Sequence, residues 1–376
     1  MMRTSGMHGM SGPASRRTLV VVVGLAVAGL VACEVQPKDR ARIESVRQTA
    51  RPGSDGVGGI GRRTGTVGVG QPVPAPDSGG SGVAVVSAEP AAVPGKPDSA
   101  GGGRTVTSPG VKVLFSDAER VFRAGDYDEA AALFEAYAAR RPENPWGHYM
   151  LGISAWRAGD HPRAEAALKR TLEVDPKHVK ALINLARVLL EQRKASDALE
   201  YAEQVVALEP GLGEGWRVLG NARSDLGMTE AAVEAYRQAL VLDERDVWTM
   251  NNLGLLMIRQ GRYEEALPSL ARATELRPDV AVFQNNLGVA LERSGHGFEA
   301  AEAFRAALEA NPEYEKARVS LARVEANLPE EGTGPTVDLG ELAALFAGEI
   351  RHWKALAVQA QEPEPVRTAG VPELDR

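Results

Sequence analysis

The chain has 376 residues, with 43 lysines and arginines, 50 aspartates and glutamates, 40 glycines and a single cysteine. One cysteine excludes an internal disulfide framework and a four-thiolate metal site. Residues 111–328 carry a net charge of −7, and nucleic-acid binding is excluded for them because neutralising phosphates needs a basic surface.

Residues 1–32 have the features of an export signal. Arg16 and Arg17 precede an apolar run that ends at Ala32; it is too short to cross a bilayer of about 30 Å but fits a signal-peptide core. The run closes with small residues before Cys33, whose sulfur is a nucleophile. This ending resembles the lipobox of bacterial lipoproteins, which implies cleavage before Cys33 and lipidation of its thiol. An ordinary signal peptide or a membrane anchor with a chance cysteine is the alternative.

Residues 33–110 are predicted to be a disordered tether. Residues 34–110 contain 16 glycines and 9 prolines but no Leu, Phe, Trp or Tyr, so little apolar burial offsets the entropy of ordering them. A flexible chain of this length reaches roughly 50 Å. The lipoprotein resemblance implies a periplasm-facing protein of the bacterial envelope, and Glu34 after the cysteine favours the outer membrane over the inner.

The rest of the chain is dominated by a 34-residue period. Prolines recur on one 34-residue ladder at Pro142, Pro176, Pro210, Pro278 and Pro312. An alanine stands twelve residues before every rung, at Ala130, Ala164, Ala198, Ala232, Ala266 and Ala300. Five residues earlier lie Gly125, Gly159, Arg193, Gly227, Gly261 and Gly295. Glycine can take the left-handed conformation that ends a helix, small residues let two helices approach closely, and proline ends the second helix. The period therefore predicts repeated helix–turn–helix units.

This pattern resembles the tetratricopeptide repeat, which implies an all-α, right-handed α-solenoid. The six predicted units are 111–144, 145–178, 179–212, 213–246, 247–280 and 281–314, followed by a capping helix at 315–328. Beyond a Pro/Gly break, Leu339, Phe346, Ile350 and Trp353 recur at helical spacing and predict an amphipathic helix over 336–361. That helix either packs on the end or in the groove of the solenoid, or docks a partner. Residues 362–376 are predicted to be disordered.

No catalytic arrangement is found in the sequence. The six histidines are scattered without a metal-ligand spacing, and no nucleophile elbow or phosphate-binding loop occurs. We therefore expect no enzymatic activity, no metal, no cofactor and no small-molecule substrate.

Binding is what the repeats imply, because first helices line a concave groove in the tetratricopeptide family. Carried onto this sequence, the groove-facing positions form an aromatic half and an amide-rich half. They include Trp146, Tyr149, Met150, Ile153, Trp156, Lys180, Asn184, Arg187, Arg217, Asn221, Trp248, Asn251, Asn252, Val282, Asn285 and Asn286. Asn side chains donate and accept hydrogen bonds, which suits the backbone of a bound peptide. They can equally be part of the repeat consensus, with Trp packed against the next helix.

Three of these residues, Arg217, Asn221 and Asn252, also resemble members of the carboxylate clamp of chaperone-binding tetratricopeptide domains. Val282 stands where that clamp has a lysine, so the clamp is incomplete.

Together these patterns predict a lipid-anchored protein–protein interaction scaffold of the bacterial envelope. Its partners would be other envelope proteins that present peptides or helices during envelope-complex assembly. A non-lipidated soluble or inner-membrane adaptor is the alternative, and an envelope hydrolase with a repeat arm is disfavoured because no segment outside the repeats is long enough for a catalytic domain.

Overall fold

The computed structural model describes residues 113–328 and 335–360. Within these ranges the chain forms fourteen α-helices and no strand, so the predicted all-α solenoid class is confirmed. The predicted signal peptide, Cys33, the tether and the tail at 362–376 lie outside the described residues and stay predictions.

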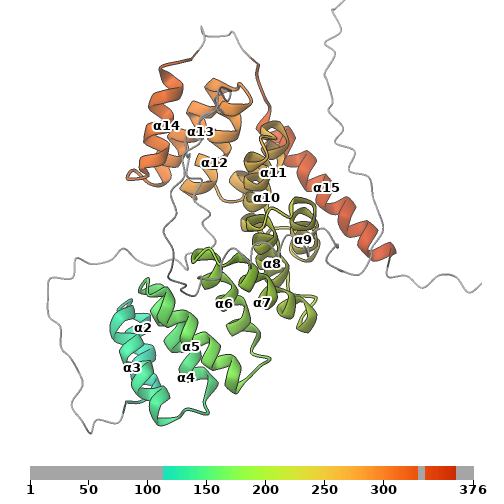
Figure 1. Cartoon of the computed structure of the whole chain (residues 1–376). Helices are drawn as coiled ribbons and strands as arrows, with labels where there is room; N and C mark the ends of the chain where they lie inside the picture. The colour runs from blue at the N-terminus through green and yellow to red at the C-terminus, as the bar shows by residue number, and fades with distance from the viewer. Residues whose placement is uncertain (1–112, 329–334, 361–376) are drawn as a thin grey trace, which may run out of the picture. The chain divides into compact units, whose positions relative to one another are not determined.

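Each predicted 34-residue unit contains one pair of helices (Figure 1). The first three pairs are α2 (Phe115–Arg123) with α3 (Tyr127–Arg140), α4 (Pro145–Arg157) with α5 (His161–Val174), and α6 (Val179–Glu191) with α7 (Ala195–Leu208). The next three are α8 (Gly213–Asp225) with α9 (Thr229–Leu242), α10 (Val247–Arg259) with α11 (Tyr263–Leu276), and α12 (Ala281–Arg293) with α13 (Gly297–Ala310). The predicted capping helix is α14 (Glu315–Glu325), and the last helix is α15 (Leu339–Gln359).

The turn inside each unit has the backbone conformation that the glycine pattern predicts. The glycines at this position have positive φ angles, for example +86° at Gly125 and +72° at Gly261. Arg193 takes the same place in the third unit with φ +62°, the only non-glycine positive φ among the described residues. A side chain is strained in this left-handed region, so this turn costs the third unit stability.

Small residues on the first helices allow close crossing with the second helices. A methyl group added at Gly254 would lie 2.4 Å from Leu270 Cγ, and one at Gly220 would lie 2.4 Å from Tyr236 Cε1. In the third unit the equivalent positions are Ala186 and Ala202, both fully buried. A larger residue on the first helix is therefore matched by a smaller one on the second, which keeps the helix pair closely packed.

First helices also contact one another along the array, since α4 touches α6, α6 touches α8, and the series continues through α10 and α12 to α14. Their accessible side chains therefore form one continuous surface from the aromatic second unit to the capping helix. We call this the first-helix face.

Helix α15 lies against second helices, not against the end of the solenoid or in its groove. It packs along α9 and α11, with Phe346, Ile350 and Trp353 buried. The Trp353 ring lies edge-on to Phe346 at 5.9 Å, and the Arg237 guanidinium lies 4.9 Å from the centre of that ring. The predicted position of this helix was therefore wrong, because packing on α9 and α11 depends on a match between surfaces far apart in the sequence.

Candidate peptide-binding face

The aromatic half of the first-helix face keeps one ring accessible. Trp146, at the start of α4, is 48% exposed, and its ring lies edge-on to Tyr149 at 5.7 Å and to His178 at 4.9 Å. The Tyr149 ring stacks on His178 at 4.9 Å. Burial raises the pKa of the Tyr149 phenol. The Tyr149 and His178 rings thus hold Trp146 in one place and leave its outer side open to a ligand.

The other aromatic residue of α4 is used within the protein. Trp156 Nε1 donates a 2.9 Å hydrogen bond to Glu191 Oε2 of the next unit, and His161 Nε2 lies 2.7 Å from the same oxygen. Ile153 is half-buried. Of the five residues of the second unit predicted for the groove, Trp146 is the only one whose side chain is largely exposed.

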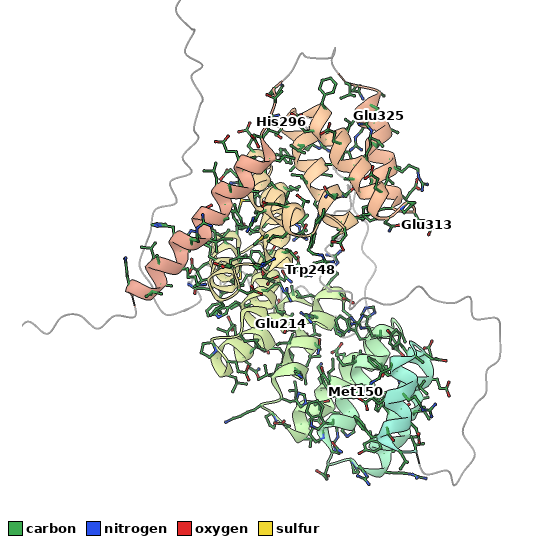
Figure 2. The ribbon with its side chains drawn as sticks, turned by 180° about the vertical axis from the view of Figure 1, so that it is seen from behind. Met150, Glu214, Trp248, His296, Glu313 and Glu325 are labelled. Atoms are coloured by element: carbon green, nitrogen blue, oxygen red, sulfur yellow. The ribbon has the colours of Figure 1, made fainter. Side chains whose placement is uncertain are left out.

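The polar side chains of the third unit are also engaged within the protein. Asn184 Nδ2 donates to the Tyr149 hydroxyl at 3.1 Å, and Arg187 forms a 2.6 Å ion pair with Glu214 of the fourth unit. Figure 2 shows the side chains over the described helices, with Met150, Glu214 and Trp248 marking the first helices of three units. Lys180 is exposed. These contacts join neighbouring units and leave Lys180 as the accessible charge among the predicted residues of this unit.

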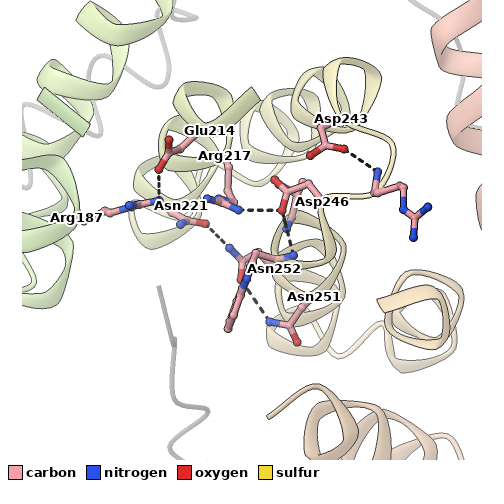
Figure 3. A network of polar contacts seen from close by, with 11 residues as sticks. Arg187, Glu214, Arg217, Asn221, Asp243, Asp246, Asn251 and Asn252 are labelled. Atoms are coloured by element: carbon pink, nitrogen blue, oxygen red, sulfur yellow. Dashed lines mark hydrogen bonds and ion pairs between the residues drawn. The ribbon is translucent and has the colours of Figure 1, made fainter. Parts of the chain in front are cut away.

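A ladder of buried amides crosses the middle of the array (Figure 3). Asn252 Nδ2 donates to Asn221 Oδ1 at 2.9 Å, and Asn286 Nδ2 donates to Asn251 Oδ1 at 2.8 Å. The Tyr236 hydroxyl donates to Asn221 Oδ1 at 2.8 Å. Since Asn221, Asn252 and Asn286 are at most 6% exposed, their amides join repeats and do not form the open ladder that we expected a peptide backbone to meet.

Arg217, one of the residues that resemble a carboxylate clamp, is also engaged within the protein. Arg217 Nη1 forms a 2.8 Å ion pair with Asp246 Oδ1, and both side chains are about nine-tenths buried. Asp246 also caps α10 by accepting from the Trp248 and Thr249 backbone N–H groups. The arginine is therefore committed to a helix cap of the next unit, which sequence spacing alone does not reveal.

Trp248 is another of the residues predicted for the groove, and it too is used within the protein. Its ring packs edge-on against Phe283 at 4.9 Å and is half-buried. Val282 is half-buried as well. This tryptophan joins α10 to α12, as the packing alternative in the sequence predicted.

A cleft of about 530 Å³ opens at the far end of the face, between α10, α12 and α14. It is lined by Ile258, Arg259, Tyr263, Asn285, Asn286, Val289, Glu292, Arg293, Tyr314, Glu315, Lys316, Val319, Ser320 and Arg323. Val319 is 55% exposed, and burial raises the pKa of Tyr314. The cleft thus combines apolar surface with hydrogen-bonding and charged groups, as ligand-binding clefts do.

Most of the residues that line this cleft are not among those predicted from the sequence. Val289 and Arg293 occupy groove-facing positions of the sixth unit, and Val319 occupies one on α14. The register that identified the other positions contained this signal. On α14 it applies only if the capping helix is treated as a seventh first helix.

The comparisons with known proteins agree with this architecture. The model of a tetratricopeptide-type family, the cilia and flagella-associated protein 70 C-terminal domain, matches residues 138–333, just over half of the chain. The chain belongs to this family. The tetratricopeptide assignment made from the 34-residue period is thereby confirmed.

Individual proteins match about a third of the chain or slightly more. The general transcriptional corepressor trfA of Dictyostelium discoideum is 31% identical over 126 residues, covering 33% of this chain and 9% of that protein. The BBSome complex member BBS4 of Mus musculus is 28% identical over 143 residues, covering 38% of this chain and 28% of that protein. The chain spans less than a third of the length of these relatives.

Among solved structures, TTC0263, a thermophilic tetratricopeptide protein of Thermus thermophilus, is 25% identical with a TM-score of 0.45. The match covers 49% of this chain and all of that one. In the described part of this tetratricopeptide chain, no group of acidic, histidine or cysteine side chains is arranged to hold a metal ion. No helix in the same part is long and apolar enough to span a bilayer.

Proposed function

We propose that the chain is a lipid-anchored scaffold of the bacterial cell envelope that binds peptide or helical segments of other envelope proteins on its first-helix face. The tetratricopeptide fold is generally a protein-interaction domain, and this supports the binding part of the proposal. The observation that supports the proposal most directly is the cleft between α10, α12 and α14, because apolar surface and polar groups are accessible together there.

The anchor is supported by sequence alone. The only cysteine of the chain follows an apolar run and small residues at position 33, which is where a bacterial lipoprotein needs a thiol. The 77 residues that follow the cysteine would let the repeats reach partners well away from the membrane. An outer-membrane location and a role in assembling envelope complexes belong to the same proposal.

The binding face is tested by site-specific crosslinking. A photoreactive amino acid in place of Val319 lies in the cleft, whereas one in place of the exposed Glu309 lies on α13, outside the cleft. We expect one discrete envelope protein to be crosslinked from position 319 and not from position 309. Equal crosslinking from both positions, or none from 319, would contradict use of this face.

The anchor is tested by Cys33→Ser, since a thioether-linked lipid needs sulfur. The variant should lose labelling by a palmitate analogue and leave the membrane fraction, whereas the tether control Val83→Leu should behave as the unaltered protein. Labelling that persists in the serine variant would rule out the lipoprotein. Loss of the anchor with crosslinking intact would instead favour the non-lipidated adaptor.

Absence of enzymatic activity is part of this proposal. It rests on the interaction role of the fold and on the lack of a catalytic motif in the sequence.

A further inference from the structure

The amide ladder follows a rule from unit to unit. In the third, fifth and sixth units an asparagine at the same repeat position donates to the unit before it: Asn184 to Tyr149, Asn252 to Asn221, and Asn286 to Asn251. Tyr149 and Asn251 occupy the same repeat position, and each accepts from the asparagine 35 residues further along the chain. By this rule a donor on α14 would serve Asn285, which occupies that position in the sixth unit.

That donor is missing. Ser320 stands one period after Asn286, and the Ser320 hydroxyl accepts a hydrogen bond from Arg323 at 3.3 Å. Asn285 is the counterpart of Asn251 one unit on, and it is 7% exposed. Its Oδ1 has no hydrogen-bond partner among the described residues. A buried acceptor without a donor is unfavourable, so the end of the ladder leaves a position that an N–H group from outside can fill.

The cleft beside Asn285 is positively charged in a negatively charged protein. Four cationic and two anionic side chains line it, whereas residues 111–328 together carry −7. Of the two anions, Glu292 accepts hydrogen bonds from Nε and Nη2 of Arg323, both at 2.7 Å, and Glu315 pairs with Arg318.

Of the other cations that line the cleft, Arg259 forms an ion pair with Asp225. Arg293 differs from it. It is exposed, and within the described ranges no hydrogen bond or ion pair to its guanidinium is found. A guanidinium in this setting favours a carboxylate, which it can hold with two parallel hydrogen bonds.

Apolar surface lies between these two polar groups. Val289 is half-buried on α12, and Val319 is 55% exposed on α14. The cleft volume of about 530 Å³ lies within the usual range of ligand-binding clefts.

We propose that this cleft binds an extended acidic peptide segment of a partner protein. Asn285 Oδ1 accepts a hydrogen bond from a backbone N–H of the peptide, Arg293 holds a peptide carboxylate, and Val289 with Val319 contacts an apolar side chain between them. This inference rests on the proposed function and adds the chemistry of the ligand to it. The carboxylate comes from an Asp or Glu side chain or from the carboxyl end of the partner.

The probe is a library of random 12-residue peptides displayed at the amino end of a phage coat protein, so that no member has a free carboxyl end. It is selected on the full chain. The strongest binder is then synthesised with an amidated end, with a free carboxyl end, and with its acidic residue changed to the amide. Binding of these fluorescent peptides is measured by polarisation at low and high salt.

We expect the selected peptides to share an acidic residue, and the Glu→Gln or Asp→Asn peptide to bind about tenfold more weakly, as does the Arg293→Gln protein. Asn285→Leu keeps the volume and removes the acceptor, and should weaken binding of every peptide about tenfold. Arg305→Gln, which alters an exposed cation on α13 whose partner Glu325 does not line the cleft, is the matched control and should bind as the unaltered protein. A free carboxyl end that restores binding of the amide-substituted peptide assigns the carboxylate to the chain terminus.

Selected peptides without an acidic residue, or equal affinity for the Arg293→Gln protein, would overturn the acidic ligand. If such peptides still crosslink from position 319, or bind at Trp146 and are lost in Trp146→Ala, the first-helix face binds peptides and only this inference fails. If no selected peptide binds the face at all, the proposed function fails with it.

Discussion

The substitution Gly254→Ala tests the close helix crossing directly. Gly254 lies in α10, where an added methyl would lie 2.4 Å from Leu270 Cγ and 2.7 Å from Leu270 Cδ2. Leu270 is fully buried, so it has no open space to move into. The methyl group can be accommodated only if α10 and α11 move apart or Leu270 leaves its rotamer.

Two effects of opposite sign decide the outcome. Alanine inside a helix is favoured over glycine by about 0.8–1.0 kcal/mol. Overpacking a filled core costs about 1–3 kcal/mol, and occasionally more. Because the contact is far shorter than carbon atoms tolerate, we expect the upper part of that range and a net loss of about 2 kcal/mol in the free energy of unfolding.

The matched control is Gly348→Ala in α15. There the nearest atom to the added methyl is Arg351 Nη2 at 3.6 Å, an ordinary contact. Only the helix-propensity effect remains, so this variant should gain up to about 1 kcal/mol. The two Gly→Ala changes are thus predicted to move stability in opposite directions.

The measurement is urea unfolding followed by circular dichroism at 222 nm. A second test adds Leu270→Ala to Gly254→Ala, which reproduces the alanine pair at Ala186 and Ala202 of the third unit. The double variant should be more stable than the sum of the single changes by about 1 kcal/mol or more, since contacting residues couple. If Gly254→Ala is as stabilising as Gly348→Ala, or the two changes are additive, the close crossing does not govern this helix pair.

Three further changes test other parts of the structure. Arg193→Gly removes the strain of a side chain at a left-handed φ of +62°. The free energy of unfolding should rise by about 0.5–1 kcal/mol after the larger entropy of unfolded glycine is subtracted. A loss of stability on urea unfolding would contradict strain at this turn. Burial lowers the pKa of His178 below its ordinary value of 6.5, so the unfolded chain takes up the proton more readily and the free energy of unfolding should fall as the pH drops below about 6.5. His178→Asn retains a helix-capping side chain and should lose that part of the pH dependence, whereas an identical pH profile would rule out His178 as its source. Trp353→Ala should release α15, at a cost of about 3–5 kcal/mol for a buried tryptophan, and hydrogen exchange of the α15 amides measures this. Leu345→Ala, at an exposed position of the same helix, is the control. Unchanged protection of the α15 amides in Trp353→Ala would show that the ring does not hold α15.

The sequence by itself determined the repeat architecture. The 34-residue spacing of Ala266, Pro278 and their equivalents specified helix pairs whose observed bounds fall inside every predicted unit. This was possible because helix capping, chain reversal at glycine and close crossing at small residues each depend on a few neighbouring residues. The same local chemistry placed Arg193 at a turn that glycine usually occupies.

The tertiary structure decided what the polar side chains do. Asn252 and Asn286 were placed correctly on first helices by their register, yet each is buried and bonded to the unit before it. Likewise, the pairing of Arg217 with Asp246 joins residues 29 positions apart. A repeat pattern gives the position of a side chain on its helix but not its partner, because partners are set by the spacing and rotation between stacked helices.

The packing of α15 and the cleft at α14 show the same division. An amphipathic stripe predicted that α15 needs an apolar surface, but only the fold shows that α9 and α11 supply it. Similarly, Ser320 has little meaning in the sequence until the amide ladder shows that a donor to Asn285 is absent there. Local periodicity encodes which residues must be buried, whereas complementarity between segments distant in the chain decides where, and so decides which groups are left for a ligand.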